Sequence, residues 1–275
     1  MPNLARDYGL QVDALRPHPG GFESECLVAD STWFIKIWRS NEPPARLEVL
    51  NELHAAGLPV PAPVPAGTGE LHAWWSGRPY AVFPYIRGRA PDDDDWQVTA
   101  RALRRVHELD GIDLPRGSMD EPAIWWLRDH LDHPWIKDRG REVAERIRRL
   151  ERAIARAAAK EVPHVVCHRD FLGQNLLVDN REVVAILDWE QAVLAPREHD
   201  LWAAAEGRHG QQVLAEYGAR DLDLDHFEYA LLARALRDIS ARVASGTDRP
   251  GVDPWGFRRI ARLDSDLEMF RPFCA

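Results

Sequence analysis

The chain has 275 residues, 45% of them hydrophobic and 29% charged, with a formal net charge of −9 at pH 7. This length suits one large core or two modest ones, and the acidic balance argues against a nucleic-acid partner, whose phosphates require a basic surface. Three scattered cysteines indicate neither a disulfide framework nor a zinc site. The N-terminus has no signal-like apolar segment and no apolar run approaches the length of a membrane span, so we expect a cytoplasmic protein without a membrane partner.

The first part of the chain is expected to form an antiparallel sheet. Residues 26–28 and 32–38 are apolar runs on either side of a short polar turn. Alternation along the second run places Lys36 on the same face as two aromatic residues, so its side chain reaches from the sheet into a cleft. A solvated lysine on an edge strand is the alternative. Ahead of these strands, the glycines of residues 19–24 let backbone N–H groups approach phosphates, although the stretch by itself would be only a turn.

The middle of the chain is expected to add one helix and one strand to this sheet. Residues 43–53 begin with two prolines and continue with an apolar stripe, which is typical of a helix start. The prolines of residues 57–65 favour an extended connection. Residues 78–88 then predict a strand that runs into a proline and a glycine.

Beyond residue 90 the hydrophobic periodicity becomes helical. Residues 98–109 and 143–160 are the clearest helices, and the second leads into a strand before residue 168. The four aspartates of residues 92–95 precede the first of these helices. Carboxylates at that position cap free N–H groups and complement the helix dipole, so we interpret them as caps.

The most informative stretch is His168-Arg169-Asp170, followed by Asn175 and then by Asp188 at the end of an apolar run. Between Asn175 and Asp188 lie two short apolar runs separated by a polar turn, which predicts a β-hairpin. Antiparallel pairing would bring Asn175 and Asp188 together at its open end. Two hard oxygen ligands there suit Mg²⁺, which takes further ligands from nucleotide phosphates. Asp170 is then placed to accept a proton from a substrate hydroxyl or to orient it.

These motifs, together with Asp188-Trp189-Glu190 and His199-Asp200-Leu201, resemble the aminoglycoside phosphotransferase and choline kinase family of protein-kinase-like enzymes. Residues 190–202 suggest the spectinomycin-modifying branch as a nearer relative. A protein kinase has Asp-Phe-Gly in place of Asp-Trp-Glu and a later Ala-Pro-Glu that this chain lacks, which argues against a protein substrate.

The resemblance implies an α+β fold of two lobes. The smaller lobe, residues 1–86, would bind the nucleotide through an antiparallel sheet with one main helix. The larger, mostly helical lobe, residues 87–275, would carry the catalytic-loop hairpin and bind the acceptor. Residues 83–90 would form the hinge between them.

The resemblance also implies the site residues. Asp170 would be the catalytic acid, Asn175 and Asp188 the magnesium ligands, and Asp200 a structural acid that braces the catalytic loop. We interpret His168 as a buried imidazole that supports the same loop through hydrogen bonds. Glu190, two residues beyond a metal ligand, is the best candidate to bind an amino-sugar acceptor.

On the nucleotide side, Lys36 would bind phosphates, as does the strand lysine of kinases. Its glutamate partner should come from the helix within residues 43–53, where Glu48 or Glu52 would face inward, although the family's spacing to the apolar positions points nearer Arg46. We favour Glu48, and a solvated glutamate on the helix face is the alternative. The remaining candidates are weaker: Gly21 and Ser24 near the phosphates, and Phe83, Tyr85 and Ile86 around the base.

We therefore predict a kinase that uses Mg²⁺ and ATP or GTP to phosphorylate a hydroxyl of a small cationic acceptor, with an aminoglycoside or aminocyclitol antibiotic as the leading acceptor. The alternative is a metabolite kinase acting on choline or ethanolamine, a hexosamine, fructosamine or homoserine. A catalytically inactive nucleotide-binding module is a second alternative. The sequence leaves the oligomeric state open, and a monomer is the simplest expectation.

Overall fold

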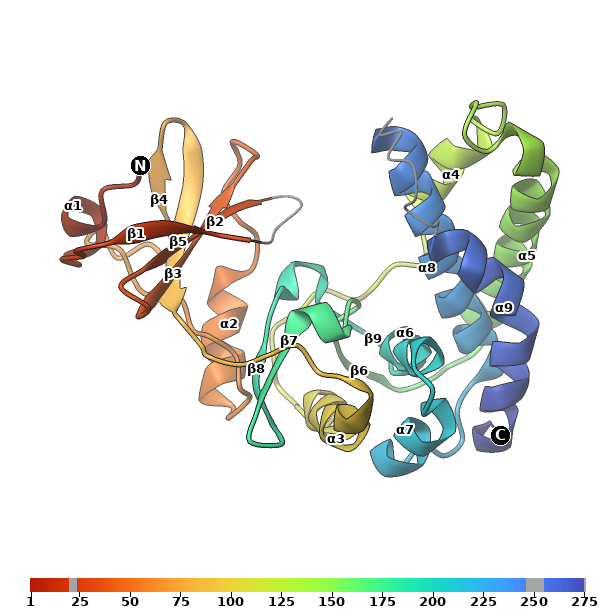
Figure 1. Ribbon diagram of the computed structural model, residues 1–275. Coiled ribbons are helices and arrows are strands. Elements are labelled where there is room, and N and C mark those ends of the chain that lie inside the picture. Colours follow the sequence, from red (N-terminus) through yellow and green to blue (C-terminus); the bar gives the residue numbers. More distant parts are fainter. Residues whose placement is uncertain (20–23, 246–254, 275) are drawn as a thin grey trace. The chain divides into compact units, whose positions relative to one another are not determined.

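The computed structural model describes residues 1–19, 24–245 and 255–274 (Figure 1). The chain forms two compact units, each made from two stretches of sequence. The first unit contains Met1–Leu114 and Asp170–Ala192, and the second contains Pro115–Arg169 and Val193–Ala275. The hairpin after the catalytic loop thus packs with the N-terminal part of the chain. The division into lobes near residue 86 stays a prediction.

The first unit contains a five-stranded sheet with the strand order β1-β2-β3-β5-β4, and its antiparallel pairing confirms the prediction from the sequence. Asp30 and Ser31 connect β2 to β3 with φ of 52° and 56°, the left-handed backbone of a tight hairpin turn. The strands are β1 (Leu15–His18), β2 (Ser24–Ala29), β3 (Trp33–Trp38), β4 (Ala73–Trp75) and β5 (Arg78–Pro84).

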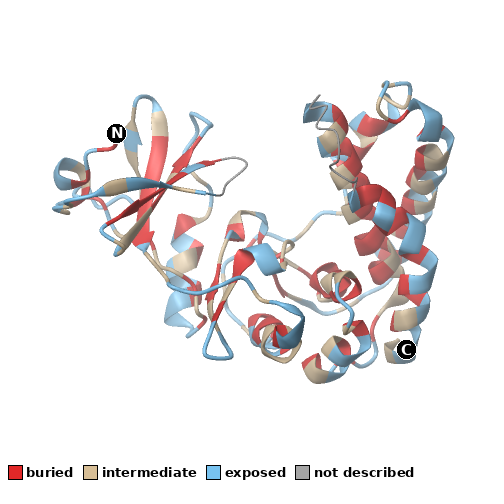
Figure 2. Ribbon diagram, viewed as in Figure 1, coloured by how far each residue is buried: buried red, intermediate tan, exposed pale blue. Residues whose placement is uncertain are grey.

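The two faces of this sheet have different neighbours. On one face, Ile35 and Ile37 of β3 are fully buried in a cluster with Tyr80 of β5. On the opposite face, Trp38 packs in a second cluster with Leu47 of helix α2 (Leu47–Ala55). Figure 2 shows the resulting run of buried residues through the central strands. Lys36 alternates with Ile35 and Ile37 and therefore belongs to the face that α2 covers.

Helix α2 begins later than the prolines indicate. Arg46, directly before the helix, has φ of 68°, so the chain turns there and Pro43 and Pro44 lie outside the first helical turn. The prediction that the prolines start the helix is wrong, because their fixed φ suits an irregular approach equally well.

The other helices of the first unit are α1 (Leu4–Tyr8) and α3 (Trp96–His107). Before α3, the Asp92 side chain accepts a hydrogen bond from the backbone of Asp94, and the Asp95 side chain accepts one from the backbone of Asp92. This is a capping box on the 3₁₀ turn Asp93–Asp95 that leads into α3, and it confirms the capping interpretation for Asp92 and Asp95. At the start of α3 itself, the side chain of Asp95 makes no capping hydrogen bond to that helix.

The predicted hairpin is present as β7 (Leu176–Asp179) and β8 (Glu182–Ile186). Gly88 lies close to it, since a Cβ built at Gly88 would come within 2.9 Å of the Leu177 Cβ. The next residue, Arg89, exchanges backbone hydrogen bonds with Val178 of β7. The segment after β5 therefore packs directly on the hairpin, and a side chain at position 88 would push the two apart.

The second unit is mainly helical and also contains a two-stranded sheet of β6 (His164–Cys167) and β9 (Val193–Pro196). Its longest helix, α8, packs against α4, α5, α6 and α9 and is buried along most of its length (Figures 1 and 2). No helix in the described parts of the chain combines the length and apolar character needed to cross a membrane. The helices are α4 (Pro122–Arg128), α5 (Gly140–Ala158), α6 (Glu198–Leu201), α7 (Gly210–Tyr217), α8 (Leu224–Ser245) and α9 (Trp255–Phe270).

Candidate active site

A cavity of about 340 Å³ lies within the first unit. Its walls come from β1, β2 and β3, the end of β5, the start of α2 and the residues at the open end of the hairpin. Gly21 lies outside the described residues, and Glu48 is not part of the lining. The candidate residues that line it are Ser24, Lys36, Phe83, Tyr85, Ile86, Asn175, Asp188 and Glu190.

Lys36 lies between two carboxylates. Its Nζ donates hydrogen bonds to Asp188 Oδ1 at 2.9 Å and to Glu190 Oε1 at 2.7 Å. Burial acts to lower the pKa of Lys36, but the charges of Glu190 and Asp188 outweigh it, so that the pKa is raised. Lys36 therefore carries a positive charge in the cavity at neutral pH.

Glu190 is the more strongly buried of these two carboxylates. Burial raises its pKa, and the neighbouring Asp188 adds to this shift while Lys36 opposes it. The carboxylate of Glu190 also accepts a hydrogen bond from Trp38 Nε1 at 2.9 Å. The sequence predicts that Glu190 binds the acceptor; the structure directs its side chain toward Lys36, and the acceptor role stays a prediction.

The structure does not pair Lys36 with a glutamate of α2. Glu48 is exposed, and Glu52, also exposed, accepts a hydrogen bond from the backbone of Asp113. The residue next to α2 that reaches the site is Arg46, which donates to the backbone oxygens of Glu190 and Ala192. The predicted pairing of Lys36 with Glu48 is therefore corrected to Asp188 and Glu190.

Asp170 is connected to Asn175 by side-chain hydrogen bonds. Asn175 Nδ2 donates to Asp170 Oδ2 at 2.8 Å and to the Asp170 backbone oxygen at 2.9 Å. The backbone N–H of Leu187 donates to the backbone oxygen of Asn175 at 2.8 Å, which closes the open end of the hairpin directly before Asp188. With its amide nitrogen turned to Asp170, Asn175 has its side-chain oxygen available as a ligand, and Asp188 lies two residues beyond the end of β8.

Asp200 binds the backbone ahead of Asp170. Its carboxylate accepts hydrogen bonds from the N–H groups of His168 at 2.7 Å and Arg169 at 2.6 Å, and both Asp200 and His168 are fully buried. Arg169 has φ of 69°, a left-handed conformation that a side chain disfavours and that these bonds stabilise. The bracing role of Asp200 and the supporting role of His168 stay predictions.

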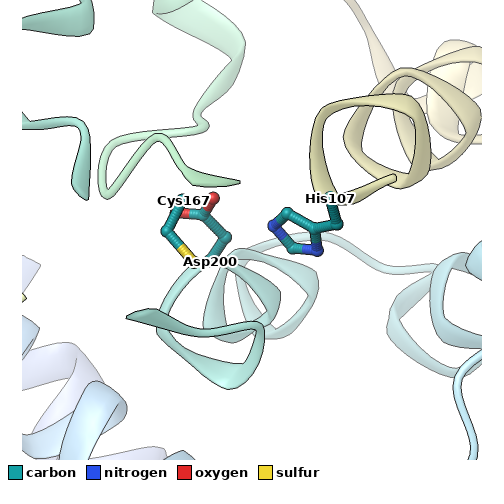
Figure 3. A group of neighbouring side chains, drawn as sticks. All are labelled: His107, Cys167 and Asp200. Atoms are coloured by element: carbon teal, nitrogen blue, oxygen red, sulfur yellow. The ribbon is translucent and has the colours of Figure 1, made fainter. Parts of the chain in front are cut away.

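The Cys167 side chain lies beside Asp200 in the second unit (Figure 3). Burial raises the pKa of the Cys167 thiol well above its ordinary value, and the charge of Asp200 adds to the shift. The thiol is therefore protonated and unreactive, and Cys26, Cys167 and Cys274 are all free. His107, also labelled in Figure 3, belongs to α3 of the first unit.

Sequence reasoning did not identify three residues of the cavity wall. His18 lies edge-on to Phe34 and Tyr85, with ring centroids 5.6 and 6.4 Å apart, and nothing in its sequence neighbourhood indicates this. Trp38 shares the face of Lys36, which the strand alternation does indicate, but its hydrogen bond to Glu190 depends on tertiary structure. The family's spacing points near Arg46 as the place of the glutamate partner, but nothing in the sequence indicates that Arg46 itself contacts the backbone of Glu190.

Residues 14–241 match the model of the phosphotransferase enzyme family, APH. The chain belongs to this family. The predicted resemblance is confirmed, and so is the prediction of a phosphotransferase that acts on a hydroxyl group.

Among characterised relatives, the homoserine kinase of Pseudomonas aeruginosa (strain UCBPP-PA14) is 25% identical over 264 residues, which cover 84% of this chain and 80% of the relative. Among solved structures, the spectinomycin phosphotransferase APH(9)-Ia in complex with ADP and spectinomycin has a TM-score of 0.71 and 19% identity, covering 97% of this chain and 94% of the other. A choline/ethanolamine kinase family protein from Mesorhizobium loti has a TM-score of 0.66 and 18% identity, covering 93% and 88%.

These likenesses confirm the predicted protein-kinase-like fold, with its N-terminal antiparallel sheet and mainly helical C-terminal part. The family uses a nucleotide as the phosphoryl donor. The relatives differ in the acceptor that their names give, so the family alone leaves the acceptor of this chain open.

Proposed function

We propose that this enzyme transfers the γ-phosphoryl group of ATP or GTP to a hydroxyl of a small cationic acceptor. One observation carries the proposal: a single cavity is lined by Lys36, Asn175 and Asp188, and Asn175 is hydrogen bonded to Asp170. The cavity thus combines a cation for phosphates, two oxygen ligands for a metal and a nearby carboxylate for a hydroxyl.

The donor nucleotide would bind in the cavity with its base near Phe83, Tyr85 and Ile86 and its phosphates near Lys36. The oxygens of Asn175 and Asp188 fit Mg²⁺, because both are hard ligands and both line the cavity. When bound there, Mg²⁺ would neutralise charge on the phosphate oxygens. Lys36 would contribute positive charge to the same oxygens.

Asp170 would act on the acceptor. Its carboxylate orients the acceptor hydroxyl and takes up the proton as the oxygen forms a bond to the γ-phosphorus. The bond between that phosphorus and the bridging β–γ oxygen breaks, and the nucleoside diphosphate leaves. The hydrogen bond from Asn175 keeps the Asp170 carboxylate in place during this step.

For the acceptor, we propose an aminoglycoside or aminocyclitol. The net charge of −9 favours a cationic ligand, and the likeness to spectinomycin phosphotransferase extends over 97% of this chain. A metabolite kinase is the second candidate, because homoserine kinases are among the relatives found by sequence, at about one quarter identity. A catalytically inactive nucleotide-binding module is disfavoured by the presence of Lys36, Asp170, Asn175 and Asp188 together.

The test is release of nucleoside diphosphate, measured by a coupled assay with ATP and with GTP. The acceptor panel contains aminoglycosides, spectinomycin, choline, homoserine and amino sugars, and the Asp170→Ala variant is the blank. Saturable turnover on one antibiotic would support a resistance kinase. Turnover confined to a metabolite would establish the second candidate, and nucleotide binding without any phosphorylated product would overturn the kinase proposal.

A further inference from the structure

We propose that Glu190 positions Lys36 for the nucleotide phosphates, and that this enzyme takes the partner of its phosphate-binding lysine from the segment after the hairpin instead of from helix α2. The inference rests on the proposed function, because binding of nucleotide phosphates by Lys36 is part of that function. The contacts that support it lie entirely within the first unit.

The first support is the geometry on β3. Lys36 and Trp38 lie two residues apart, so their side chains leave the same face of the strand. Both donate to one oxygen of Glu190, Lys36 Nζ at 2.7 Å and Trp38 Nε1 at 2.9 Å. The indole is rigid and only donates, so it fixes the carboxylate at a defined distance along the strand. The carboxylate in turn fixes the ammonium.

The second support is the anchoring of the Glu190 backbone. Arg46 Nη1 donates to the Glu190 backbone oxygen at 3.0 Å and also to that of Ala192. On the preceding residue, Trp189 is buried and its Nε1 donates to the Ile186 oxygen at 3.0 Å. The turn that presents Glu190 is therefore fixed by contacts that do not involve a nucleotide.

The third support is the position of the acidic residues of α2. The cavity wall receives Leu47 and Leu50 from this helix and Arg46 from just before it. Glu48 and Glu52 are exposed. Lys36, which is only 19% exposed, thus receives its neutralising charge from Asp188 and Glu190. Asp188 is one of the two proposed metal ligands. When a metal binds Asp188, Glu190 remains as the charged partner of Lys36.

The experiment exploits the low lysine content of the chain, which has only Lys36, Lys137 and Lys160. Trace acetylation with acetic anhydride, in EDTA and without nucleotide, is followed by mass spectrometry of the three peptides. Exposed Lys137 is the internal reference. An amine must lose its proton to react, and a paired carboxylate opposes this loss.

Glu190→Gln should increase the labelling of Lys36 relative to Lys137 about tenfold, because the buried ammonium then keeps only the Asp188 carboxylate as a charged partner. Glu48→Gln and Glu52→Gln remove the same charge and should leave the ratio unchanged. An unchanged ratio in Glu190→Gln, or an increase in either helix variant, overturns the proposal. If Glu190→Gln does not fold, Glu190→Asp tests the same contact and should give an intermediate increase.

Steady-state kinetics separate this positioning role from two others. Glu190→Gln should lower kcat/KM for the nucleotide by about tenfold to a hundredfold, as expected for a misplaced catalytic group, while KM for the acceptor stays constant. A raised KM for the acceptor, with no other change, would instead show that Glu190 binds the acceptor. A changed Mg²⁺ requirement with unchanged labelling would make it a metal ligand. Because labelling requires no turnover, it can succeed even if no acceptor is ever found.

Discussion

Two sets of hydrogen bonds order the catalytic loop at the scale of single residues. Asp200 accepts from the backbone N–H groups of His168 and Arg169, and Asn175 donates to the carboxylate of Asp170. The loop therefore has its shape before any substrate is present. Such preorganisation lowers the cost of ordering the group at the moment of reaction.

Asp170→Asn should lower kcat by about 10²–10⁴-fold, the range typical of a lost general base. Asparagine has nearly the same shape and can still accept the hydrogen bond from Asn175, so nucleotide affinity should be nearly unchanged. Calorimetric titration with nucleotide and a turnover assay measure the two quantities. Near-parental turnover in this variant would show that Asp170 does not orient the acceptor.

Asp200→Asn should lower the free energy of unfolding by about 1.5–3 kcal/mol, because a buried carboxylate that accepts two N–H bonds is replaced by an amide that can accept only through its oxygen. Urea denaturation measures the change. Asp132→Asn, an exposed aspartate in the same unit, is the control and should have little effect. Equal stability of the two variants would contradict the bracing role.

At the scale of elements, the local features were predictable and the tertiary ones were not. The hairpin between Asn175 and Asp188 follows from apolar runs around a polar turn, and the cavity-facing position of Lys36 follows from strand alternation. The partner of Lys36 does not follow, since it depends on which face α2 turns inward and on a turn far away in sequence. The prolines also indicated too early a start for α2, because a fixed φ does not decide whether a helix begins at that point.

The turn of the β7–β8 hairpin gives a prediction about stability. Asn180 and Arg181 have φ of 48° and 63°, a conformation that arginine disfavours and asparagine tolerates. Arg181→Gly should therefore raise the free energy of unfolding by about 0.5–1 kcal/mol, after the entropic cost of glycine is subtracted. Thermal denaturation measures it, with Asn180→Gly as the control that gains less. A loss of stability in Arg181→Gly would contradict the assigned turn.

At the scale of the whole molecule, the second unit contains a buried acid that makes folding depend on pH. Burial raises the pKa of Asp266 in α9 from 3.8 to about 6; Arg262 opposes the shift and Glu206 adds to it. The folded state then retains a proton that the unfolded state has already lost. Stability is therefore lost as the pH rises from about 4 to about 6, and the loss persists above that range.

Asp266→Asn should remove this penalty. At about pH 7.5 the variant should be more stable than the parent by as much as about 3 kcal/mol, and the difference should shrink as the pH falls toward 5. Denaturation curves at several pH values measure it. Asp264→Asn changes an exposed acid of the same helix and should show no such trend. A difference that does not vary with pH would assign the effect to packing instead of charge.

The contact between Arg46 and the segment that carries Glu190 bears on control of the enzyme. Arg46 donates to backbone oxygens, and its guanidinium stays charged throughout the physiological pH range. A helix that reports a signal to an active site needs a contact that a proton, a phosphate group or a binding partner can break. Carbonyl groups have no charge to neutralise and no side chain to modify. The contact between the start of α2 and the segment of Glu190 therefore depends on neither a titrating nor a modifiable partner group, so it should persist across the physiological pH range.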